Sequence, residues 1–217
     1  NIFGLDAERK AIGFRSNRVG QIDSNKERDL IKGDFNNHGI EIRWLQNYPL
    51  GNKKAVFLVG GKYYNAKNTS AQGPGSSASD ADFSFYRNRY PNYQRQSDYT
   101  YPNKNLALFV ENIFYLSEKI SFTPGMRYED ILTSSDGSFK KINTDAAGNV
   151  ILNETLSGNE SRKRSFVLFG LGASYKAKKS LEFYANFSQN YRSVTFTDIS
   201  VINPAFSINR NITDEKG

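Results

Sequence analysis

Arginine and tyrosine side chains concentrate in one polar stretch of the chain, where they could recognise an anion. A guanidinium group binds carboxylate oxygens through paired hydrogen bonds, and a tyrosine ring adds rigid amphipathic contact area. This composition favours a small ligand rich in carboxylate oxygens, although a solvated loop can have the same composition. The candidate ligand-binding residues of this stretch are Arg87, Arg89, Tyr90, Arg95 and Tyr99.

A second group of arginines alternates with glutamates in segments that have the pattern of β-strands. Because successive side chains of a strand point to opposite faces, residues two apart share a face. These arginines are predicted either to line an anion path or to pair with their neighbouring glutamates. The arginines are Arg43, Arg127 and Arg192, and the glutamates are Glu41, Glu129 and Glu182.

Catalytic chemistry has little support in the sequence. The chain has no cysteine and one histidine, His38, so thiol catalysis and thiolate metal sites are excluded. A hydrolase would have to use His38, which has no nucleophile-elbow motif beside it. Glu129 and Asp130 are adjacent and therefore face opposite sides of a strand. The sequence predicts no enzyme, no catalytic residue, no metal site and no directly bound cofactor.

The net charge of +7 and the pI near 9.4 favour an anionic partner. Interleaved arginines and tyrosines also occur in proteins that bind single-stranded nucleic acid. Here they lie in a predicted loop rather than across a strand face, so nucleic acid is not a predicted partner.

The elements that must position these residues are strands with a period of two. Between residues 105 and 116 the apolar positions are mainly even, and between 120 and 132 the even positions are apolar while the odd ones are small, polar or charged. This alternation is typical of strands with one apolar face. Pro124 cannot donate a hydrogen bond to the ladder, so we expect a bulge there. The side chains expected to face lipid include Leu106, Phe122, Phe169 and Phe183.

The same plan recurs in strand pairs around residues 40–65 and 167–191. Short turns are predicted at about 48–54, 117–119 and 176–180. Long extracellular loops, rich in Ser, Gly, Asn and Tyr, are predicted at about 66–104 and 133–165. Short turns at one end and long loops at the other are typical of outer-membrane barrels.

No uninterrupted apolar run approaches 18 residues, so a membrane-spanning helix is excluded. Tyrosines near both ends of the predicted strands suit the two membrane interfaces: Tyr48, Tyr115 and Tyr175 near the short turns, and Tyr63, Tyr64, Tyr128 and Tyr191 farther along. The predicted fold is an all-β, antiparallel, up-and-down transmembrane β-barrel. The alternative is a soluble or surface β-sandwich that acts as a binding or adhesin module.

Several strings resemble the barrel of TonB-dependent outer-membrane receptors. These are residues 105–116 (NLALFVENIFYL), 119–129 (KISFTPGMRYE) and 181–198, together with Asn203-Pro204 and the ending DEKG. Residues 34–44 and 57–64 look most like the ferric-dicitrate branch. Ser193 stands where the family often has proline.

The resemblance implies one barrel domain over residues 1–217, contributing six or seven of about 22 strands. It also implies a plug, which is N-terminal in the family and is expected to be absent from these residues. Both ends of the chain are expected to be cuts through a longer polypeptide. Expected partners are a ferric chelate (ferric citrate or another siderophore complex), outer-membrane lipid and lipopolysaccharide, and the TonB energy-coupling protein through the missing plug. Iron is expected only as chelated substrate, and the expected location is the bacterial outer membrane.

Overall fold

The structure is a computed structural model that describes residues 1–14, 16–18, 21–192 and 215–217. The family-like strings within 193–198 and at Asn203-Pro204, and the residue Asp214, lie outside the described residues. The described part contains strands, turns and loops, and it has no helix long and apolar enough to cross a membrane.

Strands account for most of the described residues. They are β1 (Ile2–Phe14), β2 (Ser16–Arg18), β3 (Gln21–Ile22), β4 (Arg28–Leu50), β5 (Lys53–Pro74), β6 (Ser97–Tyr115), β7 (Ile120–Thr144), β8 (Val150–Ser157), β9 (Glu160–Lys178), β10 (Leu181–Ser188), β11 (Tyr191–Arg192) and β12 (Glu215–Lys216).

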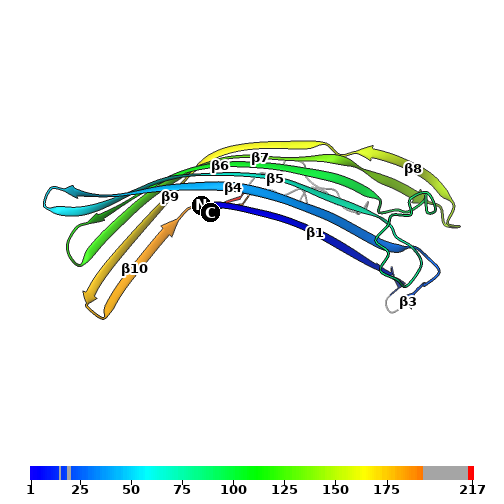
Figure 1. Cartoon of the computed structure of the whole chain (residues 1–217), viewed down its shortest axis with the longest axis horizontal. Helices are drawn as coiled ribbons and strands as arrows, with labels where there is room; N and C mark the ends of the chain where they lie inside the picture. Colours follow the sequence, from blue (N-terminus) through cyan, green and yellow to red (C-terminus); the bar gives the residue numbers. More distant parts are fainter. Residues whose placement is uncertain (15, 19–20, 193–214) are drawn as a thin grey trace.

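The main sheet is a single curved layer of eight strands (Figure 1). Its order is β1-β4-β5-β6-β7-β9-β10, with β8 paired to β7, and the paired strands are antiparallel. The sheet is open along β1 and β10 within the described residues, and two small two-stranded sheets, β2-β3 and β11-β12, are not paired with it. The all-β, antiparallel, up-and-down prediction is confirmed. The β-sandwich alternative is wrong, because no second sheet covers the main one within the described residues.

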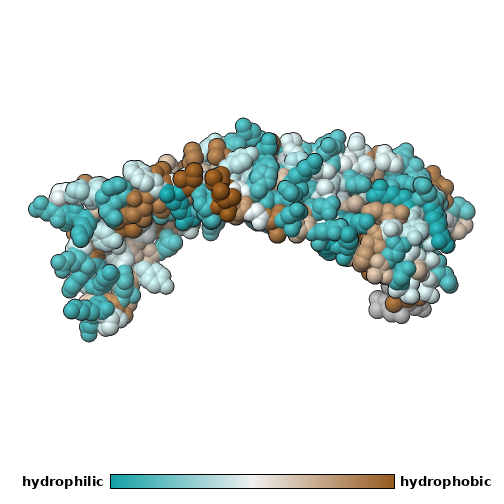
Figure 2. All heavy atoms as spheres, in the orientation of Figure 1, coloured by the Kyte–Doolittle hydropathy of each residue, from teal (hydrophilic) through white to brown (hydrophobic). Residues whose placement is uncertain are grey.

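The two faces of the sheet differ in chemistry and in exposure. The expected lipid-facing side chains share one face, here called the apolar face. Directly paired residues of neighbouring strands lie on the same face, and Met126 is paired with Phe169 and Phe122 with Ala173. Along β9 the apolar-face residues are exposed while those of the opposite, polar face are half-buried. Side chains on the inner side of a curved sheet converge, so the polar face is the inner one. Figure 2 shows the largest hydrophobic patch on the half nearer the short turns.

The short connections lie at one end of the sheet. They occupy residues 51–52, 116–119 and 179–180, close to the three predicted turns. Gly51 adopts a φ of 59°, a left-handed conformation that favours glycine in a two-residue turn. The expected bulge at Pro124 is absent: Glu111 pairs with Gly125 and Phe114 with Phe122 in one unbroken register.

The long connections are much shorter than predicted, because the strands continue through their polar sequence. Ser70 pairs with Tyr99 on β6, which leaves only residues 75–96 of the predicted loop 66–104 between strands. A strand whose two faces are both wet needs no apolar alternation, so hydrophobic periodicity misses it.

The predicted loop 133–165 is mostly a hairpin that extends the sheet. Ser135 pairs with Glu160 and Ser138 with Ser157, so β8 and β9 keep one register along β7 on either side of Gly158. The hairpin ends in a turn at 145–149, where Gly148 has a φ of 87°.

The tyrosines expected at two membrane interfaces divide between the faces. Tyr48 pairs with Ala55 and Tyr63 with Ile40, which puts both tyrosines on the apolar face together with Tyr128 and Tyr175. Tyr64, Tyr115 and Tyr191 belong to the polar face, where Tyr191 stacks on Phe166 with ring centroids 3.7 Å apart. Sequence position alone could not separate the two groups.

Candidate ligand-binding site

A row of side chains crosses the middle of the polar face from β4 to β7. The register places Arg43 opposite Gly60, Gly60 opposite Phe109, and Phe109 opposite Arg127. A Cβ added at Gly60 would lie 2.4 Å from the Phe109 ring, so the absence of a side chain there lets the ring lie flat across β5. The aromatic ring therefore reaches toward β4 while it also contacts β7.

Both arginines of this row use the same ring. The guanidinium carbons of Arg43 and Arg127 lie 5.7 and 5.6 Å from the Phe109 ring centroid, within cation–π distance. Arg43 also forms an ion pair with Glu41 at 2.5 Å, and Arg127 pairs with Glu129. The alternative of arginine–glutamate pairing on one strand is therefore present in the structure. We call these five residues the arginine–phenylalanine cluster.

A hollow of about 340 Å³ lies beside the cluster. Gly125 and Gly170 leave its floor without side chains, while the two cluster arginines and Glu111 supply charge at its wall. Glu129 is 8% exposed, and its Oε2 has no hydrogen-bond partner among the described residues. A buried carboxylate oxygen of this kind can accept a hydrogen bond from a ligand or another segment. The cluster can therefore hold an anion on its arginines and a donor on Glu129.

The candidate residues of the predicted loop 66–104 are not brought together in one site. Arg87 pairs with Asp98 at 3.2 Å and lies 4.7 Å from the Phe85 ring, on the apolar-face side of the strands. Arg89 lies 5.6 Å from the ring of Tyr90, its neighbour in sequence. Arg87 therefore contacts the start of β6 and Arg89 contacts its own loop.

Arg95 and Tyr99 belong to the polar face. Arg95 lies 3.8 Å from the Asp29 carboxylate, at the rim of a pocket of about 460 Å³. Tyr99 stacks on Tyr101 with centroids 5.8 Å apart, and partial burial raises the pKa of both phenols. Arg192 pairs with Glu215 at 3.4 Å in the small β11-β12 sheet.

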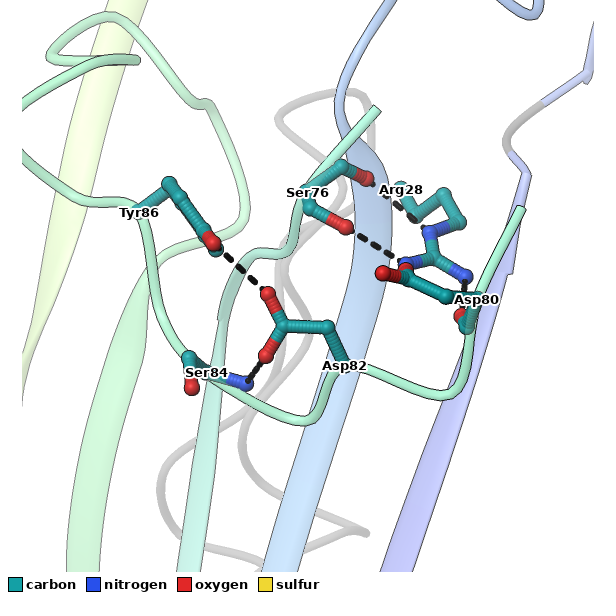
Figure 3. A network of polar contacts seen from close by, with 6 residues as sticks. All are labelled: Arg28, Ser76, Asp80, Asp82, Ser84 and Tyr86. Atoms are coloured by element: carbon teal, nitrogen blue, oxygen red, sulfur yellow. Dashed lines mark hydrogen bonds and ion pairs between the residues drawn. The ribbon is translucent and has the colours of Figure 1, made fainter. Parts of the chain in front are cut away.

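Sequence reasoning missed the residues that hold the outer loop in place. Arg28 and Asp29 begin β4 and bind opposite ends of residues 75–96. Figure 3 shows the Arg28 side chain reaching Ser76 and Asp80 from this loop. The alternation of apolar and polar residues could not predict these contacts, because the partners of Arg28 and Asp29 in this loop lie 47–66 residues away in the sequence.

A carboxylate–phenol contact orders the middle of the same loop. Asp82 accepts hydrogen bonds from the Tyr86 hydroxyl at 2.7 Å and the Ser84 amide at 2.9 Å (Figure 3). The Tyr86 hydrogen bond, and then that of Ser84, lower the pKa of Asp82, while the same carboxylate raises the pKa of Tyr86.

The single histidine lies on the outward side of the sheet. His38 belongs to the apolar face, where its Nε2 is 3.3 Å from the Asn65 side-chain amide. Across the described ranges, no group of three or more His, Cys, Asp or Glu side chains is arranged to hold a metal ion.

A family model described as TonB dependent receptor-like, beta-barrel matches residues 5–217. No curated protein matches significantly in sequence. Solved structures with the same fold include the unliganded ferric citrate transporter FecA, at 20% identity and a TM-score of 0.55, covering 88% of this chain and 24% of that one. The ferric-catecholate import receptor Fiu of E. coli K12 has 11% identity and a TM-score of 0.56, covering 88% and 29%. The chain thus spans about a quarter of the length of these structures.

Proposed function

The chain belongs to the TonB-dependent receptor-like β-barrel family, and we propose that it forms part of the barrel wall of an outer-membrane receptor that imports a ferric chelate. The proposed cargo is ferric citrate or another siderophore complex, with iron carried as chelated substrate. An energy-coupling partner of the TonB type would drive import through a plug segment outside this chain.

The observation that carries the proposal is the division of the sheet into two unlike faces. Leu108 and Phe169 are 51% and 56% exposed on the apolar face, which a watery environment would disfavour over so long a band. The opposite face carries the arginine–phenylalanine cluster, which suits a wet interior. Lipid outside and a polar passage inside account for both faces at once.

The cluster supplies chemistry for an anionic cargo. Each arginine keeps donors beyond its single glutamate contact, because a guanidinium has five N–H groups. A chelate rich in carboxylate oxygens could exchange with the glutamates along this path. Of the candidates in the predicted loop 66–104, Arg95 and Tyr99 would contribute here, because both lie on the polar face.

The apolar face also supports lipopolysaccharide as a partner. Three lysines gather on this face. Leu132 is paired with Lys104 on one side and with Lys163 on the other, one step beyond the Leu106–Asp130 pair. The third lysine, Lys67, lies diagonally from Lys104 on the neighbouring strand. All three lysines are exposed, and one of them, Lys163, has a weak 3.8 Å contact with Asp130. The phosphates of lipopolysaccharide would meet the ammonium groups of these lysines where the apolar face ends. Replacing all three with glutamine should lower the lipopolysaccharide that copurifies with the receptor, and unchanged retention would contradict this partner.

Uptake of radioactive iron by the intact receptor tests the function. Cells in which this receptor is deleted should lose uptake of at least one ferric chelate, tested as ferric citrate and as catecholate and phenolate complexes, and regain it with the restored gene. Arg43→Gln combined with Arg127→Gln should lower uptake at least tenfold, since the loss of even one hydrogen bond to a charged group costs about 1.5–3 kcal/mol.

Lys141→Gln is the matched control, because Lys141 is exposed on the outer hairpin and far along β7 from the cluster. Deletion without any change in iron uptake would overturn the proposed function. Normal uptake by the double arginine variant at equal receptor levels would leave the family in place and remove the cluster from the passage.

A further inference from the structure

Residues 75–96, here called the outer strap, wrap around the beginning of β4. Arg28 holds the first half: its Nε donates to the Ser76 carbonyl at 3.0 Å, and its guanidinium forms an ion pair with Asp80 at 3.0 Å (Figure 3). The backbone joins as well, since the Gly75 amide donates to the Arg28 carbonyl at 2.8 Å. The Arg28 side chain is 5% exposed, so its charge depends on these partners.

The next residue holds the second half of the outer strap from the opposite face. Asp29 accepts hydrogen bonds from the Tyr93 hydroxyl and from the Gln72 side chain at 2.9 Å, and it lies 3.8 Å from Arg95. Tyr93 is 2% exposed, so its ring is fully packed. Because consecutive strand residues point to opposite faces, Arg28 binds the outer strap on one face of β4 and Asp29 binds it on the other.

The outer strap is also fastened to the hairpin formed by β7 and β8. The Lys140 side chain donates to the Pro91 carbonyl at 2.9 Å, and the Lys140 amide donates to the Gln96 carbonyl at 2.8 Å. The Asn153 side chain donates to the Asn92 side chain at 3.1 Å. The segment thus crosses the outer ends of β5 and β6 from β4 to the hairpin.

We propose that the outer strap is a permanently seated brace that joins the outer end of β4 to the β7-β8 hairpin as one rigid unit. It is not a lid that closes on a ligand. Arg28 and Asp29 are its positioning residues, and they hold Arg95 over the polar face before any ligand arrives. The brace follows from contacts within the chain and does not rest on the proposed cargo.

Coupling between its two ends is the property to measure. In the intact receptor without ligand, Asp29→Asn should raise hydrogen exchange of the strap about tenfold or more, since it weakens charged hydrogen bonds. The hairpin at 138–157 should exchange faster in the same variant, although Asp29 does not touch it. The central residues of β5 and β6 should remain unchanged, which shows that the barrel still folds.

Asp34→Asn is the matched control, because Asp34 is an exposed aspartate of β4 whose contact is Thr69 on the neighbouring strand. It should leave both segments unchanged. Faster exchange of the strap in Asp29→Asn with an unchanged hairpin would overturn the brace, because the two ends would then move independently.

Spin labels give a second measurement that leaves Arg28, Asp29 and both Lys140 contacts in place and replaces only the Asn153–Asn92 hydrogen bond. The chain has no cysteine, so Asn92→Cys with Asn153→Cys places two nitroxides at the far attachment without competing sites in this segment. A seated brace predicts one strongly broadened spectrum both without ligand and with ferric citrate. A substantial unbroadened component in either condition would show an open strap and overturn the proposal.

Discussion

Glycines on the polar face decide how closely its aromatic rings can lie against the sheet. At Gly60 an added Cβ would meet the Phe109 ring at 2.4 Å and the Ile42 carbonyl at 2.7 Å. The sequence predicted that Arg43 and Arg127 share the polar face, and the register confirms it. It could not predict that one phenylalanine serves both arginines, because this contact depends on a glycine in the strand between them.

Gly60→Ala should therefore destabilise the barrel by about 1–3 kcal/mol, the usual cost of forcing a group into a packed site. The measurement is urea unfolding of the receptor in detergent, followed by loss of tryptophan fluorescence and of folded-form migration on gels. Gly61→Ala is the control, since its Cβ would meet the flexible end of Leu108 at 3.3 Å and the Ala107 carbonyl at an ordinary contact distance of 3.7 Å. Equal stability of both variants would show that the ring moves without cost.

The Asp82–Tyr86 contact predicts a defined pH window for the outer strap. Asp82 has a lowered pKa, so its stabilisation is present above its unfolded value of about 3.9 and is lost as pH falls through the lower folded pKa. Tyr86 has a raised pKa, so its stabilisation is present below about 10 and is lost as pH rises through the folded pKa.

Protection factors of residues 80–90, corrected for intrinsic exchange, should form a plateau between about pH 4 and 10 and fall beyond it. Tyr86→Phe removes the phenol and should lower the plateau and remove its alkaline limb. An alkaline limb that persists in Tyr86→Phe would assign it to another group.

Strand alternation was predictable where one face is apolar and failed where both faces are polar. Along β9 the apolar residues from Val167 to Tyr175 were assigned correctly, and their exposure alternates as expected. The outer parts of β5 and β7 were assigned to loops, because Ser, Thr and Asn on a doubly wet strand resemble loop composition. Pairing with a neighbouring strand defines these segments, and pairing is not visible in local sequence.

A single arginine on each face tests which face meets lipid. Leu108→Arg, in a row with Gly61 and Tyr128, should cost about 2–4 kcal/mol of folding free energy if the apolar face lies in hydrocarbon. Thr123→Arg is the control on the polar face, where the neighbouring Gly172 leaves room for a long side chain. Refolding into lipid vesicles under a urea gradient gives both values. A larger cost for Thr123→Arg would reverse the faces.

At the scale of the whole molecule, the main sheet of the described residues is one open layer, and its edges at β1 and β10 and its apolar face determine how the chain behaves alone. Unpaired edge strands and exposed apolar surface promote association in water. The family and fold were predictable from strings such as residues 105–116 and 119–129, which together resemble a barrel hairpin of the family. The outer strap was not, because its contacts join residues far apart in sequence and of ordinary polar type.

The isolated 217-residue chain should give a cooperative β-sheet signal by far-ultraviolet circular dichroism only with detergent. In plain buffer we expect aggregation, because burial of the apolar face then requires another copy of the chain. A monodisperse chain that melts cooperatively in buffer would contradict a lipid-facing apolar face.

The great length of β4 and β7 has a kinetic consequence. They have 23 and 25 residues, whereas a tilted strand needs about 9–11 to cross the membrane. In the closed receptor proposed above, more than half of each strand would stand above the lipid as a deep well. A molecule that dissociates near the bottom of such a well collides with its walls many times before it escapes, so most dissociation events end in recapture. Height alone would then lengthen the residence of a weakly held cargo, without any additional contact.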